Sequence, residues 1–147
     1  MIMKNLFILS IFCCLSSTML WSQNSDTKKA DKYFESFAYV DAIDAYEKLI
    51  QKGKANAYVY KQLAIANMKT SNFEASERLF KRYLRSSRNP EAIDYFNYAQ
   101  TLLINEEYDN FKKAMLDFAD IAPRDQRAKA FLENPDYLMD LQSMTPR

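Results

Sequence analysis

Histidine is absent from this chain, and glycine occurs once among its 147 residues. Without histidine, the chain lacks the side chain that most enzymes use for acid–base chemistry near neutral pH. A single glycine cannot form a glycine-rich phosphate-binding loop. Together with only four prolines, it also leaves little turn chemistry for a β-sheet protein. The composition therefore predicts an all-α fold and argues against catalysis.

Cysteine is missing from most of the chain, since Cys13 and Cys14 both lie in an apolar run near the N-terminus. That run, residues 6–21, follows the positive charge of Lys4 and is shorter than the ~20 residues that a membrane-spanning helix needs. We expect residues 1–22 to be a cleavable secretory signal peptide. The exported chain would then fold without disulfides, in the periplasm or in association with the outer membrane.

An excess of either charge is lacking too. Once Lys4 is removed with the signal peptide, 19 basic and 19 acidic residues remain, which argues against a nucleic-acid partner. With neither histidine nor cysteine left, a metal site would need carboxylates alone. The nearest clusters lie close to expected turns and are interpreted as helix-start charges. They are Asp41 with Asp44, and Glu106 and Glu107 with Asp109. We expect no metal, no cofactor and no small-molecule substrate.

What the chain does have is a repeat of aromatic and apolar residues at helical spacing. In each of three sets, an aromatic residue is followed at +3, +7 and +10 by packing residues, and the offsets between sets are 34 and 35 residues. Such a period is typical of stacked helical hairpins, in which each unit buries its apolar face only against its neighbours. The sets are Tyr39, Ala42, Tyr46, Leu49; Phe73, Ser76, Phe80, Tyr83; and Tyr108, Phe111, Met115, Phe118.

The periodicity predicts three pairs of helices and a helical C-terminal end. Ser25 or Asp26 is the expected N-terminal cap of the first helix, and Gly53 is the expected stop after the second. A short turn at Ser71 and Asn72 should make neighbouring helices antiparallel. The expected helices are 28–37 and 41–52, 57–70 and 72–85, 90–104 and 108–121, with short closing helices at 125–132 and 135–141.

These features resemble a tetratricopeptide repeat (TPR) array. The resemblance implies an α-α superhelix of three repeats, at about 23–56, 57–91 and 92–123, with a C-terminal capping segment at 124–147. It also implies a scaffold for protein–protein interaction rather than an enzyme. Beyond the three sets above, it is carried by Tyr60, Leu63, Ala64 and Asn67 in the second repeat and by Tyr95, Tyr98, Ala99 and Leu102 in the third.

Three departures from the repeat pattern bear on the geometry. Polar Asp26 and Lys29 stand where the first repeat should have large residues, which suits an end repeat with nothing stacked on it. Ser76 is a mild change at a small-residue site. Phe111 places a ring where two helices usually cross closely, which leaves the geometry of the third pair open.

A narrower resemblance concerns the cell envelope. A chain that opens with this array and continues through Asn134-Pro135-Asp136-Tyr137 to Met144-Thr145-Pro146 resembles the N-terminal portion of multidomain OmpA-like proteins. In that family the array precedes a β-propeller and a peptidoglycan-binding domain, and some members serve type IX secretion and gliding. The resemblance implies a spacer or assembly domain of an envelope protein. Peptidoglycan binding does not follow, because the matching residues cover the array alone.

In TPR arrays the first helix of each pair lines a concave groove. Aromatic, methionine and isolated polar side chains in such a groove suit an extended peptide or a docked helix of a protein partner. The alternative is that some of them pack against the next helix or are covered by residues 124–147. The carboxylate clamp of some family members is absent, because Thr27, Asp31 and Gln62 stand at the matching places. The predicted groove residues are Tyr58, Lys61, Ile65, Met68, Ile93, Phe96, Gln100 and Leu103.

A second candidate surface is basic. Its residues are spaced to share one helix face, which could contact anionic lipid or an acidic partner as a peripheral attachment. The alternative is a solvated face with Glu74–Arg78 and Glu77–Lys81 pairs, worth roughly 0.2–0.5 kcal/mol each. Charge is also sorted along the chain, since residues 57–90 are basic overall and residues 92–123 acidic. The basic face consists of Arg78, Lys81, Arg82 and Arg85.

Overall fold

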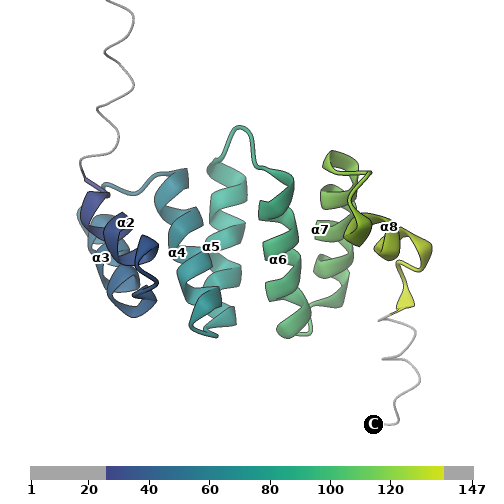
Figure 1. The fold of residues 1–147 in the computed structure, drawn as a ribbon, viewed down its shortest axis with the longest axis horizontal. Coiled ribbons are helices and arrows are strands. Elements are labelled where there is room, and N and C mark those ends of the chain that lie inside the picture. The colour runs from purple at the N-terminus through teal and green to yellow at the C-terminus, as the bar shows by residue number, and fades with distance from the viewer. Residues whose placement is uncertain (1–25, 138–147) are drawn as a thin grey trace, which may run out of the picture.

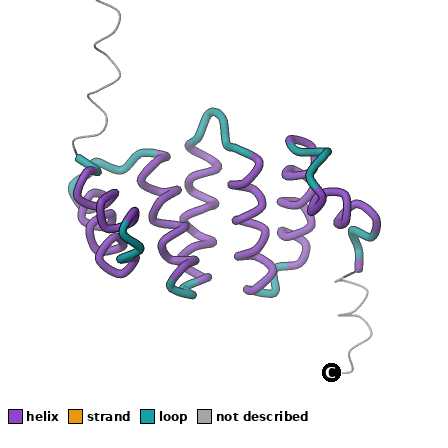
Figure 2. The backbone as a smooth tube through the Cα atoms, in the orientation of Figure 1, coloured by secondary structure: helices purple, strands orange, loops and turns teal. Residues whose placement is uncertain are grey.

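A computed structural model describes residues 26–137, which form seven α-helices and no strand (Figures 1 and 2). The expected signal peptide, the candidate cap Ser25 and residues 138–147 of the closing segment lie outside the described residues. The all-α prediction is confirmed. The helices are α2 (Lys28–Glu35), α3 (Tyr39–Gln51), α4 (Ala57–Lys69), α5 (Phe73–Ser86), α6 (Ala92–Ile104), α7 (Tyr108–Ile121) and α8 (Gln126–Glu133).

The helices are arranged as three hairpins, α2–α3, α4–α5 and α6–α7, placed side by side in a row with α8 at the C-terminal end (Figure 1). Each helix packs mainly on its neighbours in sequence, and α4 also contacts α6 directly. Hollows instead separate α3 from α5 and α5 from α7. The first helices of the hairpins therefore form an inner layer and the second helices a wider outer layer, which is an α-α superhelix.

The core consists of the residues that defined the repeat in the sequence. The +3, +7 and +10 members of all three sets are buried, while the leading aromatic residues are half-buried. Tyr46 and Phe80 are fully buried in the first two hairpins, and Phe118 in the third. Burying a large apolar side chain contributes about 1.5–3 kcal/mol. No hairpin could bury these residues alone, so stability depends on stacking.

The three hairpin turns share one backbone geometry. The residues at the turns, Phe37, Ser71 and Glu106, have φ values of 61°, 61° and 62°. In each turn the next amide bonds back to a carbonyl five residues earlier, as Ala38 does to Tyr33 at 2.9 Å. This is the Schellman C-cap, which usually uses glycine because a side chain disfavours the left-handed region. The first helix was expected to run to Phe37 but ends at Glu35, because Phe37 has left-handed backbone angles.

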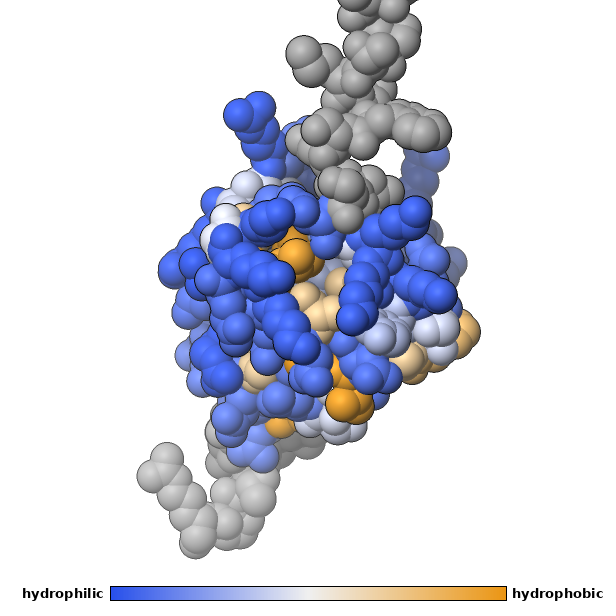
Figure 3. Space-filling view, turned by 90° about the vertical axis from the view of Figure 1, so that its left-hand side faces the viewer, coloured by the Kyte–Doolittle hydropathy of each residue, from blue (hydrophilic) through white to orange (hydrophobic). Residues whose placement is uncertain are grey.

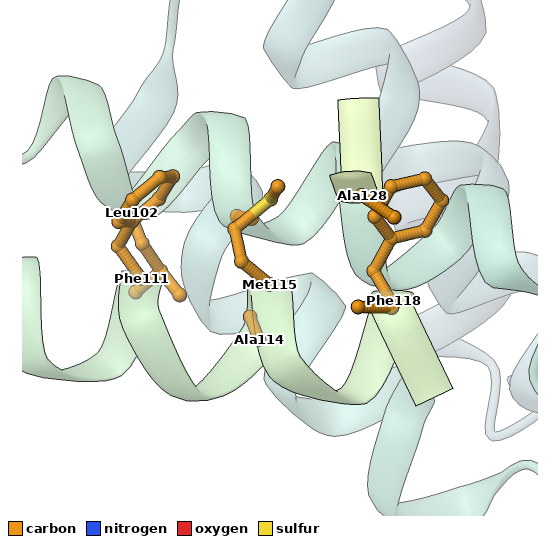
Figure 4. Close-up of a cluster of buried hydrophobic side chains, with 8 residues drawn as sticks. Leu102, Phe111, Ala114, Met115, Phe118 and Ala128 are labelled. Atoms are coloured by element: carbon orange, nitrogen blue, oxygen red, sulfur yellow. The ribbon is translucent and has the colours of Figure 1, made fainter. Parts of the chain in front are cut away.

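Ala42, Ser76 and Phe111 stand where the two helices of each hairpin cross closely, and all three are buried. Ala42 and Ser76 are fully buried, and the Ser76 hydroxyl donates a hydrogen bond to the Ala64 carbonyl at 2.9 Å. The ring of Phe111 makes an edge contact with Phe131 of α8, with 6.0 Å between ring centroids. Figure 4 shows Phe111 beside Leu102 in the cluster that joins α6, α7 and α8. The third hairpin thus forms in the same way as the others, because α8 supplies a partner for the extra ring.

The N-terminal end of the stack is polar, as expected for an end repeat. A hollow between α2 and α3 is lined by charged side chains of both signs, including Asp26 and Lys29, and Figure 3 shows this end as mostly hydrophilic with few apolar residues. The expected cap was wrong: Thr27 holds the N-cap position of α2, while Asp26 pairs with Lys54 at 2.7 Å.

Candidate functional site

The inner surface carries all eight predicted groove residues, four on α4 and four on α6. Tyr58 and Ile93 are exposed by 43% and 42%. The other six are half-buried, and several of their apolar side chains pack against the core clusters beneath. The eight residues therefore form a partly buried, mostly apolar helix surface from which two side chains protrude.

At the α2–α4 junction, the Asp31 carboxylate collects three hydroxyl donors. Tyr46 and Tyr58 donate to Oδ1 at 2.6 and 2.9 Å, and Thr27 donates to Oδ2 at 2.7 Å. Burial, followed by the hydrogen bond to Asp31, raises the pKa of the Tyr46 hydroxyl far above its ordinary value. Burial and the same carboxylate raise the pKa of Tyr58. Asp31 thus fixes the orientation of the exposed Tyr58 ring and links α2 to α4.

At the α4–α6 junction, the Asp94 carboxylate is fully buried. Tyr83 donates to Oδ2, as does the Glu91 amide at 2.9 Å, in a capping box that begins α6. Lys61 Nζ lies 2.7 Å from Oδ1, which accepts no other hydrogen bond within residues 26–137. A buried carboxylate needs such an ionic partner because burial alone strongly disfavours its charge.

Lys61 spans the gap between the two inner helices. Its ammonium also pairs with Glu91 at 2.9 Å, and it lies 5.7 Å from the centroid of the Tyr83 ring. Burial alone lowers the pKa of Lys61, but the hydrogen bonds to Asp94 and Glu91 outweigh it and leave the pKa raised. Lys61 therefore serves to join α4 to α6 and is engaged before any partner arrives.

At the α6–α8 junction, Arg127 covers Phe96. The guanidinium carbon lies 4.2 Å from the Phe96 centroid and 5.3 Å from that of Phe118. Arg127 also pairs with Asp125 at 2.7 Å, and its hydrogen bonds lower the pKa of Asp125 to about 2. The capping segment therefore covers part of the predicted groove surface at Phe96.

Sequence reasoning missed Asp94, the hydroxyl of Tyr46 and the role of Arg127. Asp94 could have been found, because Glu91 and Asp94 have the spacing of a capping box at the start of a helix. Nothing in the sequence pairs Tyr46 of α3 with Asp31 of α2, or Arg127 of α8 with Phe96 of α6. Such contacts depend on how the helices pack.

The predicted basic face is exposed but divided. Arg78 and Arg82 line the hollow between α3 and α5, whereas Lys81 and Arg85 line the hollow between α5 and α7. Arg82 also stacks over the Tyr60 ring at 4.5 Å.

The two expected helix pairs with glutamate do not form. Within residues 26–137, none of the four basic side chains has an ion pair within 4.0 Å. The Glu77 carboxylate instead accepts a hydrogen bond from the side-chain amide of Asn105 at 2.7 Å. The face is therefore less neutralised than a simple solvated surface with paired charges.

The described chain also lacks a membrane-spanning helix and a cluster of metal-ligating side chains. None of the helices within residues 26–137 combines the length and the hydropathy needed to cross a bilayer. In the same residues, no three acidic, cysteine or histidine side chains come together in a way that could hold a metal ion.

Solved structures share this architecture. The C-terminal part of a TPR repeat-containing protein from Cytophaga hutchinsonii matches with a TM-score of 0.61 and 18% identity, over 65% of this chain and 38% of that one. The second TPR domain of human RPAP3, solved in complex with the HSP70 peptide SGPTIEEVD, matches with a TM-score of 0.64 and 18% identity, over 76% of this chain and 92% of the domain. The first TPR domain of human RPAP3 matches with a TM-score of 0.63 and 19% identity, over 81% and 94%.

These similarities establish the fold. The chain is an α-α superhelix of the tetratricopeptide repeat type, as its sequence predicted. No protein-family model and no curated protein matches the chain. At 18–19% identity the likeness extends to the fold and not to the partner of any neighbour.

Proposed function

We propose that this chain is an exported, non-catalytic scaffold of the cell envelope that holds a segment of a partner protein in its inner groove. The observation that supports this most directly is the exposure of Tyr58 and Ile93 on adjacent inner helices. Exposed aromatic and branched side chains on rigid elements are typical binding residues. The human RPAP3 domain solved with a peptide shows that a neighbour of the same fold binds a peptide.

The inner surface is prepared for binding because its helices are already tied together. Asp31 links α2 to α4, Lys61 links α4 to α6, and Arg127 links α6 to α8. A partner would therefore order few side chains of this chain when it binds, which reduces the entropy cost of association.

The chemistry of the groove defines the partner segment. Ile65, Met68 and Leu103 offer half-buried apolar surface, with Gln100 as an isolated hydrogen-bonding group. An extended peptide or an amphipathic helix with an apolar face matches this lining. The partner is expected in the envelope, because residues 1–22 have the pattern of a secretory signal.

Two alternatives from the sequence remain as competing proposals. One is peripheral attachment to anionic lipid through the basic face, and the other is a spacer role within an OmpA-like envelope protein. Binding to anionic vesicles that weakens with salt and with Arg82→Glu would favour the first. Neither the lipid-attachment proposal nor the spacer proposal predicts a protein partner that binds through the groove.

The groove is tested with a pair of matched substitutions. Ile93→Ala removes an apolar side chain of α6 that is 42% exposed, and Leu116→Ala removes one on α7 that is 43% exposed. A partner captured from envelope extracts would be purified and its affinity measured by calorimetry. We expect Tyr58→Ala and Ile93→Ala each to weaken binding by about tenfold, or ~1.4 kcal/mol, and Leu116→Ala to leave it unchanged. Equal affinity for all variants would contradict the groove.

A further inference from the structure

The outer surface holds a hollow of about 320 Å³ between α5 and α7, with α6 as its floor. We call it the α5–α7 hollow. Lys81 and Arg85 line it from α5, and Lys113 lines it from α7. Its floor includes the rings of Tyr95 and Tyr98. Three cationic side chains from two helices thus border one aromatic cavity.

A second hollow, of about 570 Å³, lies at the equivalent place one repeat earlier, between α3 and α5. We call it the α3–α5 hollow. Positions 34 or 35 residues apart line both: Glu47 corresponds to Lys81, Gln51 to Arg85, and Arg78 to Lys113. Glu47 and Gln51 of the α3–α5 hollow are therefore replaced by the basic residues Lys81 and Arg85 in the α5–α7 hollow. The fold supplies the cavity in both places, and the side chains make the α5–α7 hollow more cationic, with three basic and one acidic residue against two basic and one acidic residue in the α3–α5 hollow.

The cations of the α5–α7 hollow have no ionic partner of their own. All three side chains are exposed, and within residues 26–137 none of them has a carboxylate within 4.0 Å. Asp117 is the one acidic residue that lines this hollow. In the α3–α5 hollow, by contrast, Arg82 stacks on the Tyr60 ring at 4.5 Å. The positive charge of the α5–α7 hollow is therefore available to a ligand.

The floor of the same hollow offers hydrogen-bond donors. Burial raises the pKa of Tyr98, with a further contribution from Glu77, and burial and Asp117 raise that of Tyr95. Both hydroxyls therefore stay protonated at neutral pH. Neither donates a hydrogen bond to another described residue.

We infer that the α5–α7 hollow binds an oxyanion, a phosphate ester or carboxylate carried on a compact aromatic or apolar group. Lys81, Arg85 and Lys113 would hold the oxyanion through charge-assisted hydrogen bonds, and the tyrosine floor would contact the group that carries it. The volume lies at the lower end of the range for small-ligand sites. This site is on the opposite surface from the groove and does not depend on the function proposed above.

The test is a titration of the purified protein with phenyl phosphate, followed by calorimetry and by amide chemical shifts. Lys113→Gln and Arg85→Gln should each weaken binding about tenfold. Arg78→Gln is the matched control, because Arg78 holds the position of Lys113 in the α3–α5 hollow and its loss changes the net charge equally. Its affinity for phenyl phosphate should remain that of the unaltered protein. Equal weakening by Arg78→Gln, or no saturation by phenyl phosphate, would overturn the site.

Two further probes separate the possible sources of the anion. Inorganic phosphate should bind more weakly than phenyl phosphate, and benzoate should compete with phenyl phosphate, because the floor contacts the ring. Vesicles containing phosphatidylglycerol should not release the bound phenyl phosphate. Vesicle binding that falls equally with Arg78→Gln and Arg85→Gln, together with equal affinity for the two phosphates, would show a diffuse basic surface and overturn the site.

Discussion

The carboxylates of Asp31 and Asp94, at two junctions between inner helices, are stabilised by different kinds of partner. Asp31, at the α2–α4 junction, is half-buried and accepts three hydroxyl hydrogen bonds, with no ion pair among residues 26–137. Asp94, at the α4–α6 junction, is fully buried and holds the Lys61 ammonium at 2.7 Å. Partial access to water and three hydrogen bonds are enough to stabilise the charge of Asp31. The charge of Asp94 has no access to water and therefore requires a cation.

The comparison also explains why the two junctions should differ in strength. The Asp94 site joins a tyrosine of α5, a lysine of α4 and the first turn of α6. The Asp31 site joins α2 to α3 and α4 through neutral donors alone. Charge-assisted bonds in a buried site lose more when one member is removed than bonds between a carboxylate and hydroxyls near the surface.

The largest effect is expected for Asp94→Ala. It leaves the Lys61 ammonium and the Tyr83 hydroxyl without their buried acceptor, and we expect a loss of about 3 kcal/mol in the free energy of unfolding. Urea denaturation followed by circular dichroism measures it. Tyr83→Phe, which removes one hydroxyl and keeps the ion pair, should cost about 1 kcal/mol. A loss for Asp94→Ala no greater than that for Asp31→Ala would contradict the comparison.

A smaller effect is expected for Asp31→Ala, about 1.5 kcal/mol, because the fully buried Tyr46 loses the acceptor of its hydroxyl. The double variant with Tyr46→Phe should lose less than the sum of the two single variants, since both remove one interaction. The same denaturation experiment gives all three values. Strict additivity would show that the hydrogen bond contributes nothing to stability.

The third prediction concerns the ionisation of the tyrosines, which has the smallest effect on the free energy of unfolding at neutral pH and a clear effect at alkaline pH. The folded chain raises the pKa of Tyr46, Tyr58 and Tyr83 above the ordinary value of 10.0. Above pH 10 the native state therefore holds more protons than the unfolded state. Stability is fully present below pH 10 and falls above it, by up to about 1.4 kcal/mol per pH unit for each group.

Denaturation midpoints at pH 9, 10 and 11 measure this slope. Tyr46→Phe should make it shallower, because one proton is no longer retained on folding. Tyr137→Phe is the control, since that side chain is exposed. A stability that rises with pH in this range would have the wrong sign for buried neutral tyrosines.

The helices and their pairing were predictable because they follow from local rules. The period of aromatic residues placed the helices within three residues of their observed bounds, and Tyr108–Ile121 was predicted at its observed limits. The turn between Ile104 and Tyr108 was also predicted at its observed place, whereas Phe37 was expected to be helical. Phe37 and Glu106 both take left-handed backbone angles that glycine usually takes, and their identities do not predict that conformation.

The candidate site was predictable only in part. Helical spacing put Tyr58 and Ile93 on the inner surface, because residues on one helix face can be counted. It did not show that Lys61 is engaged by Asp94 or Phe96 by Arg127. Nor did it show that the basic residues of α5 divide between two hollows, since that depends on which helices lie on either side.

By itself, the sequence determined that this protein is a stack of helical hairpins. Its apolar residues repeat at helical spacing and can be buried by stacking helix pairs, and its single glycine and four prolines leave little turn chemistry for a sheet. Only the tertiary structure decided which polar groups meet. The groups that meet at Asp31, at Asp94 and in the α5–α7 hollow come from different helices, and the distances between helices are set by how their buried faces pack.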